Sequence, residues 1–212
     1  IFNNMKKNIV FIAYQNLQLE FKHTKISLLW LPLTFAMLIF AKAFFLGDIL
    51  KRGEDFIIYL SIGVWVWQYI AMSINAFGSC IYDNKIILNI KIKPISLIHV
   101  TLFRMFFILS LNTIVLFIFF QFYYLPINYL FFLSSLALFL FGTYQLGKFL
   151  SIISFYVRDI TIFINSFLTV VFFLSPIFWY PDQLSEKKQL FLQFNPVFHV
   201  LNIFRDSIIL GT

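Results

Sequence analysis

The chain has 212 residues, of which 61% are hydrophobic, 21% aromatic and only 12% charged, with a net charge of +7. About a quarter of the residues of a soluble globular domain are charged, so this composition excludes a soluble enzyme core and predicts an integral membrane protein. The single cysteine, Cys80, excludes a disulfide framework.

Five apolar stretches are long enough to cross a bilayer, because a helix needs about 20 residues to span the hydrocarbon core of roughly 30 Å. They are residues 28–46, 56–78, 97–123, 129–149 and 160–179. The sequence therefore predicts an all-α integral membrane protein with a single membrane domain over residues 1–212. Five crossings would place the two ends of this sequence on opposite sides of the membrane.

Basic residues fall unevenly on the two sides of these spans. If the N-terminus lies inside, the inner side carries the whole net charge of +7 and the outer side sums to zero. Loops rich in Lys and Arg stay in the cytoplasm, so we expect a multi-pass protein with a cytoplasmic N-terminus. The charges are spread over loop ends and do not form a stripe, which favours anionic lipid over nucleic acid as their counterpart.

The segment before the first span has a helical pattern of its own. Its apolar face consists of Val10, Ala13, Leu17 and Phe21. Because a basic amphipathic helix lies along the lipid headgroups, we expect a cytoplasmic interface helix within residues 1–26, ending near Lys22 and Lys25. The alternative is an ordinary polar tail.

The connection between the second and third spans, residues 79–96, is the most polar inner loop. Its notable residues are Asp83, Asn84, Lys85, Asn89, Lys91, Lys93 and Pro94. A short helix that ends before Pro94, as the restriction on the residue before proline favours, would present Lys and Asn to a cytoplasmic partner. A topology anchor without any partner explains the same residues equally well.

The last inner connection is very short and contains Arg158 and Asp159. An acidic residue at this place stabilises the N-terminus of the following helix through the helix dipole. The charged residues within or beside spans, Lys42 and Arg104, lie near span ends and can extend toward the interface. These charges alone indicate no ion-coupled transport.

Residues 142–149 follow the spacing of a phosphate-binding loop except at the last position, where Phe149 replaces the required Ser or Thr. They also lie inside an apolar stretch, whereas such a loop joins a strand to a helix. We therefore expect no nucleotide site and no cofactor in this chain. The three histidines are scattered and have no metal-ligand spacing.

Several short motifs follow one another along the chain. They are the Leu-Trp-Leu-Pro segment at 29–32, residues 60–67, residues 89–94, Tyr-Val-Arg-Asp-Ile at 156–160, residues 173–179, and Asn195-Pro196 followed by Phe-Arg-Asp at 204–206. In this order they resemble the membrane subunits of bacterial ABC exporters for lipid-linked polysaccharides. This family contains the permeases for O-antigen, capsule and teichoic acid.

The resemblance implies a homodimer of six-span permease subunits in the bacterial inner membrane. Two copies of a separate subunit would bind ATP and Mg²⁺ and hydrolyse the ATP, so the chain itself would not be an enzyme. It also implies that residues 79–96 are the coupling loop for this ATPase, with the interface helix beside them. Arg158 and Asp159 would belong to a cytoplasmic gate.

The resemblance further implies that residues 180–212 form short external helices that dip back into the membrane. Asn195 and Pro196 would lie at their junction, and Arg205 near their end. In the family a sixth span follows, and we expect that this sequence stops at Thr212 before reaching it.

A glycan channel is expected to combine aromatic rings, which pack on the apolar C–H faces of sugars, with neutral polar groups. The candidate lining residues are Trp65, Trp67, Tyr69, Phe178, Trp179 and Tyr180. Aromatic belts at the membrane interfaces are the alternative for these side chains. Similarly, Lys22 and Lys25 either attract the pyrophosphate of a polyprenyl-linked glycan or only anchor the topology.

Two other functions remain open at this point. One is an exporter of small hydrophobic molecules or drugs, which shares the general fold of the family. The other is a membrane scaffold that transports nothing.

Overall fold

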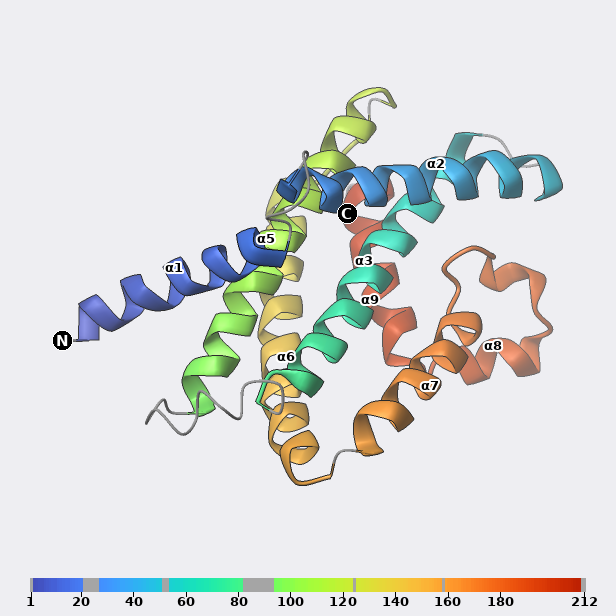
Figure 1. Cartoon of the computed structure of the whole chain (residues 1–212). Helices are drawn as coiled ribbons and strands as arrows, with labels where there is room; N and C mark the ends of the chain where they lie inside the picture. Colours follow the sequence, from blue (N-terminus) through green and yellow to red (C-terminus); the bar gives the residue numbers. More distant parts are fainter. Residues whose placement is uncertain are drawn as a thin grey trace.

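The computed structural model describes residues 2–20, 27–50, 54–81, 94–123, 125–157 and 159–210. Every regular element within these ranges is helical, which confirms the all-α prediction (Figure 1). In chain order the elements are α1 (Phe2–Glu20), η1 (Ser27–Leu29), α2 (Trp30–Leu50), α3 (Glu54–Ser79), α5 (Pro94–Gln121), α6 (Tyr129–Tyr156), α7 (Asp159–Leu174), η2 (Pro181–Gln183), α8 (Glu186–Leu192), α9 (Pro196–Arg205) and η3 (Asp206–Leu210).

Three of the described helices are long and apolar enough to cross a membrane. They are Phe56–Ser79 within α3, with 24 residues, and α5 and α6, with 28 residues each. These helices coincide with the second, third and fourth predicted spans. The apolar part of α2, Trp30–Lys42, and α7 are shorter.

The fifth span is shorter than the sequence predicts, because α7 ends at Leu174 and the prediction runs to residue 179. Pro176 has no backbone N–H, and the residue before a proline avoids the helical region, so Ser175-Pro176 stops the helix. At 1.5 Å per residue, α7 is about 24 Å long, less than the roughly 30 Å of a hydrocarbon core. α7 is therefore shorter than a full span, and the chain turns after Leu174.

Helix α3 lies at the centre of the molecule, where it packs against α2, α5, α6, α7 and α9 (Figure 1). Helix α1 packs against α5 through Ala13 and Leu17, which are both buried. These two residues belong to the apolar face that the sequence pattern predicts. Tyr14 meets Phe107 of α5 edge-on, with 6.2 Å between ring centroids.

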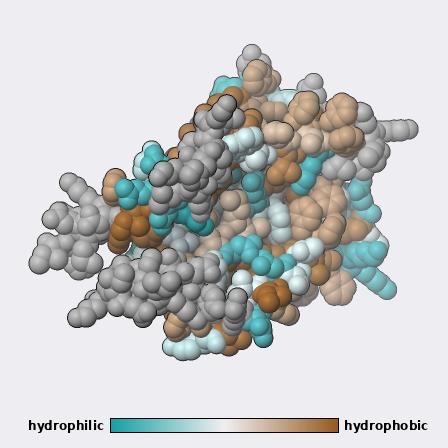
Figure 2. Space-filling model, viewed as in Figure 1, coloured by the Kyte–Doolittle hydropathy of each residue, from teal (hydrophilic) through white to brown (hydrophobic). Residues whose placement is uncertain are grey.

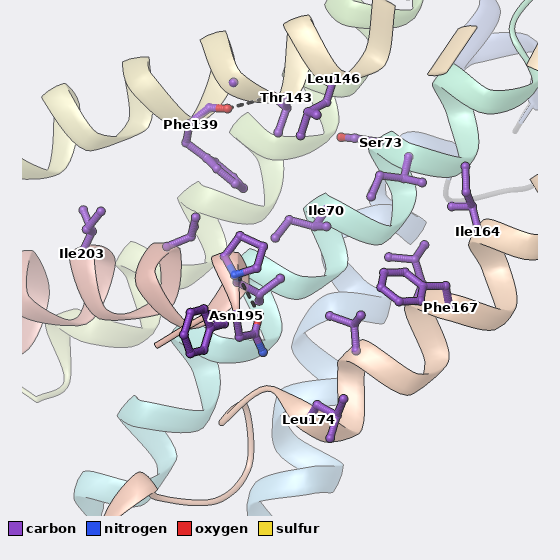
Figure 3. Close-up of a pocket in the computed structure, with 18 of the residues that line it drawn as sticks. Ile70, Ser73, Phe139, Thr143, Leu146, Ile164, Phe167, Leu174, Asn195 and Ile203 are labelled. Atoms are coloured by element: carbon purple, nitrogen blue, oxygen red, sulfur yellow. Dashed lines mark hydrogen bonds between the residues drawn. The ribbon is translucent and has the colours of Figure 1, made fainter. Parts of the chain in front are cut away.

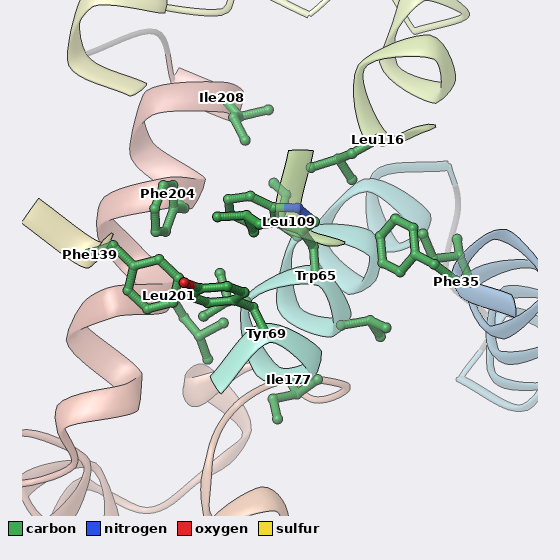
Figure 4. Packing of buried hydrophobic residues seen from close by; sticks show 14 of the residues in the cluster. Phe35, Trp65, Tyr69, Leu109, Leu116, Phe139, Ile177, Leu201, Phe204 and Ile208 are labelled. Carbon is green, nitrogen blue, oxygen red and sulfur yellow. The ribbon is translucent and has the colours of Figure 1, made fainter. Parts of the chain in front are cut away.

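The core is built around Trp65 of α3, which is 1% exposed (Figure 4). Its indole N–H donates to Thr113 Oγ1 of α5 at 3.2 Å. Its ring lies 5.0 Å from Phe204 of α9 and 6.0 Å from Phe132 of α6. Helices in lipid associate through close packing and interhelical hydrogen bonds, and Trp65 supplies both where α3 meets α5, α6 and α9.

Large apolar side chains also face outward. Leu130 is 81% exposed, Phe122 77% and Leu138 73%, and hydrophobic residues cover broad areas of the face shown in Figure 2. In water such a surface would drive aggregation, whereas in a bilayer it meets acyl chains. The outer surface is therefore that of a membrane protein.

Several predicted site residues lie outside the described residues. They are Lys22, Lys25, Asp83, Asn84, Lys85, Asn89, Lys91, Lys93 and Arg158. Their predicted roles stay predictions. Of the flanking residues, Pro94 begins α5, a position where its missing N–H breaks no helical hydrogen bond, and Asp159 begins α7.

Candidate functional site

One face of α3 supports the segment that follows α7. Tyr59, Gly63 and Trp67 are four residues apart, so they lie one above another on the same side of the helix. This side faces α7 and the turn at residues 175–180. We call that turn the return segment, because it takes the chain from α7 back toward α8 and α9.

Tyr59 and Gly63 fix the position of the return segment. The Tyr59 hydroxyl lies within hydrogen-bonding distance of the carbonyl oxygens of Pro176, at 3.1 Å, and Trp179, at 3.0 Å. A Cβ atom at Gly63 would lie only 2.8 Å from the Ile177 carbonyl oxygen, so only glycine allows the backbone to come this close. The ring of Tyr180 packs 4.2 Å from that of Tyr59.

Arg205, at the end of α9, also contacts both Tyr59 and the return segment. Its guanidinium lies 3.4 Å from the centroid of the Tyr59 ring, and Nη2 donates to the Pro176 carbonyl oxygen at 2.8 Å. The side chain is 5% exposed, and its Nε and Nη1 have no hydrogen-bond partner. Arg205 is thus a buried cation that bonds to the backbone of the return segment.

Asn195 links the end of α7 to the start of α9. Its Nδ2 donates to Ser175 Oγ at 3.0 Å, while its Oδ1 accepts from the backbone N–H of Val197 at 2.9 Å and so caps α9. Pro196 occupies the first turn of α9, which suits a residue that has no N–H. Asn195 and Pro196 therefore fix the corner between α8 and α9.

Aromatic rings gather where α3 meets α7. Phe172 lies 5.3 Å from Trp67 and 5.5 Å from Phe178, measured between ring centroids, and we call these three residues the α3–α7 aromatic cluster. All three are partly exposed. Lys42 of α2 places its Nζ 5.2 Å from the centroid of the Phe172 ring. A cation therefore lies against an open group of aromatic rings.

A groove of about 1290 Å³ opens on the other side of α7, between α6 and α7 (Figure 3). Helices α3, α8 and α9 complete its walls, and its lining is almost entirely apolar. Ser73, Thr143 and Asn195 are among its polar lining residues, and Lys188 is a charged one. Trp179 also lines the groove, whereas Trp67, Phe172 and Phe178 do not.

The predicted lining residues fall into two groups. Trp65 and Tyr69 are buried, 1% and 4% exposed, and pack in the core of this protomer. The others are partly exposed and lie on or beside the return segment: Trp67, Phe178, Trp179 and Tyr180. Gly63 is identified from the sequence only as part of the motif at residues 60–67, and Phe172 is not identified. The spacing of Tyr59, Gly63 and Trp67 is the signal that could have identified this face of α3.

Comparison with known proteins gives consistent results over nearly the whole chain. Residues 9–209 match the family described as ABC-2 type transporter. Two relatives from Klebsiella pneumoniae, each named O-antigen export system permease protein RfbA, are 25% identical to the chain. One aligns over 214 residues, 96% of this chain and 81% of the relative, and the other over 213 residues, 96% and 80%.

Proposed function

The chain belongs to the ABC-2 type transporter family, and from this premise we propose that it moves lipid-linked polysaccharide of the O-antigen, capsule or teichoic acid type out across the bacterial inner membrane. As a member of the family, it is a membrane permease subunit and not an enzyme. A separate ATP-binding subunit carries the ATPase. Family membership also argues against a membrane scaffold that transports nothing.

The polysaccharide part of the proposal is supported by the two relatives named for O-antigen export. The chemistry of the α3–α7 aromatic cluster adds to this support. Sugar rings present apolar C–H faces, which pack against the electron-rich faces of aromatic rings. The partly exposed rings of Trp67, Phe172 and Phe178 offer such faces beside the return segment.

In the proposed cycle, two copies of the permease form a dimer and each binds one ATPase subunit, which holds ATP and Mg²⁺. Lys22 and Lys25 attract the pyrophosphate of the polyprenyl-linked glycan at the inner leaflet. ATP binding closes the ATPase subunits and moves the loop at residues 79–96. The movement passes through α3, which carries Trp67 of the aromatic cluster, and the glycan advances outward.

A second candidate function is export of small hydrophobic molecules. The large apolar groove between α6 and α7 favours it, because apolar ligands bind where a concave surface offers apolar walls and few polar groups. The relatives favour the polysaccharide.

The test is glycan export by Trp67→Ala in cells that depend on this permease. Losing one aromatic contact of about 0.5–1.5 kcal/mol should lower the export rate roughly two- to tenfold. Surface polysaccharide after a timed induction gives the rate. The amount of co-purifying ATPase should stay unchanged, since Trp67 lies far along α3 from residues 79–96.

Trp30→Ala is the matched control, because Trp30 lies at the start of α2, away from the cluster, and is 36% exposed. Export should remain normal in this variant. If Trp67→Ala exported glycan at the normal rate, the aromatic cluster would not be part of the glycan path. If both variants and the parent expelled hydrophobic dyes but no glycan, the second candidate function would replace the first.

A further inference from the structure

Lys42 is the only charged residue between Lys25 and Asp48, in an otherwise apolar segment. A lysine costs up to about 2.5–3.5 kcal/mol at the centre of a membrane helix and less toward its ends, and Lys42 is the last residue of the apolar part of α2, Trp30–Lys42. Its contact with the Phe172 ring, at 5.2 Å, returns about 0.5–2 kcal/mol. The aromatic contact offsets at least part of the cost of placing a charge in this apolar helix.

The usual partner of such a charge is a carboxylate, and the side chains that the structure describes supply none within ion-pair distance of Lys42. The ammonium does not simply extend away from the protein either. It is half-buried and lies against α7, the helix that packs on the same side of α3 as Trp67. The Lys42 ammonium is therefore free to pair with an anionic group of a bound ligand.

The surroundings of Lys42 narrow the chemistry of this anion. Phe172 is the ring that contacts the ammonium, Trp67 and Phe178 each pack on Phe172, and none of the three rings is fully buried. Inorganic phosphate has no apolar face to pack on the rings, and a neutral sugar offers the ammonium only hydroxyl oxygens, which accept weaker hydrogen bonds than an anion does. A sugar that carries a carboxylate or phosphate uses both, because its ring packs on an aromatic face while its anionic group pairs with Nζ.

We propose that Lys42, Trp67, Phe172 and Phe178 form a subsite that binds an anionic sugar unit of the exported glycan. Lys42 pairs with the carboxylate or phosphate of that unit, and the aromatic rings hold the sugar itself. The permease thus selects acidic over neutral polysaccharides at this point of the path. This inference rests on the proposed function, because it assigns the chemical class of the glycan.

The test uses the purified protein in nanodiscs of phosphatidylcholine, whose headgroup has no net charge. Oligogalacturonate and a malto-oligosaccharide of equal length serve as the acidic and the neutral probe, and tryptophan fluorescence reports binding near Trp67. We expect the acidic probe to bind at least about tenfold more tightly. Lys42→Gln should abolish this preference and leave binding of the neutral probe unchanged, while Lys42→Arg, which keeps the charge, should retain the preference.

Lys148→Gln is the matched control, since Lys148 also lies over an aromatic ring, at 4.7 Å from the centroid of Tyr144, but near the other end of the bundle. This variant should keep the preference for the acidic probe. An acidic preference that survives Lys42→Gln, or that is absent from the parent protein, overturns the subsite. Binding of the neutral probe, measured in the same titration, would still support the proposed glycan transport.

A third experiment tests whether the anion that pairs with Lys42 belongs to the glycan or to a lipid headgroup. The titrations are repeated in nanodiscs that contain phosphatidylglycerol. If the anionic headgroup occupies Lys42, the acidic preference should disappear in these discs, and the glycan subsite is overturned. An unchanged preference supports an anionic group on the glycan.

Discussion

Arg205 makes favourable and unfavourable contributions of similar size to the free energy of folding. A hydrogen bond from a charged donor to the Pro176 carbonyl contributes about 1.5–3 kcal/mol, and a desolvated cation–π contact with Tyr59 contributes about 2 kcal/mol. Leaving Nε and Nη1 buried without partners costs about 1–3 kcal/mol each. The net effect on stability is close to zero, so positioning of the return segment is the main consequence of this residue.

We therefore expect Arg205→Met to change the melting temperature by less than about 4 °C, equivalent to roughly 1 kcal/mol, because apolar groups can replace buried ions at little cost. Hydrogen exchange at residues 175–180 should rise severalfold in the same variant, since it removes the bond to Pro176. Gly63→Ala should raise the exchange too, because its Cβ pushes on Ile177. A large loss of melting temperature without faster local exchange would mean that Arg205 acts mainly in global stability.

The packing of α6 on α3 is decided by a few small side chains. Ser151 donates to the Phe77 carbonyl oxygen at 2.8 Å, and Cys80 Sγ lies 3.2 Å from Ser151 Oγ. A Cβ at Gly147 would lie 2.5 Å from the ring of Phe77, which is itself buried. This contact fixes the end of α3 from which residues 79–96 continue.

Gly147→Ala should lower the free energy of unfolding by about 1–3 kcal/mol, the usual cost of overpacking, even though alanine favours the helix. Gly142→Ala is the matched control in the same helix, because a Cβ there meets nothing within 4 Å. It should be neutral or stabilise by up to about 1 kcal/mol. Thermal unfolding in detergent measures both, and equal melting temperatures would contradict the close packing at Gly147.

Much of the fold at this scale could be predicted from the sequence, because length and hydropathy define α3, α5 and α6 without any knowledge of packing. The orientation of side chains around a helix could not. Trp65 and Trp67 are two residues apart and therefore point to opposite sides of α3, one into the core and one toward α7. With apolar residues all round the helix, no periodicity separates the two faces.

The same limit applies to the candidate site. Lys42 was interpreted as a residue that reaches toward the interface, since it lies near the end of a predicted span. Its contact with Phe172 depends on where α7 packs and on its early end at Leu174, which are tertiary features. The sequence identifies Tyr180 and Asn195 as candidates, whereas the pairing of Tyr180 with Tyr59 and of Asn195 with Ser175 depends on the tertiary structure.

For the molecule as a whole, the uneven charge distribution predicts where the ATPase binds. The side predicted to be inner carries the entire +7, and Lys91 and Lys93 lie in its most polar loop. Reversing both charges to glutamate would place like charges against any acidic docking surface, at a cost of several kcal/mol. Since 1.4 kcal/mol is a factor of ten in affinity, Lys91→Glu combined with Lys93→Glu should reduce the co-purifying ATPase at least tenfold.

The paired variant Lys187→Glu with Lys188→Glu tests whether the position of the charges matters. These two lysines lie in α8, on the side predicted to be external, and they are exposed. The ATPase should co-purify with this variant as it does with the parent protein. Equal losses in both pairs would mean that net charge and not the loop at 79–96 governs assembly, whereas loss only with Lys187 and Lys188 would place the cytoplasm on the opposite side of the molecule.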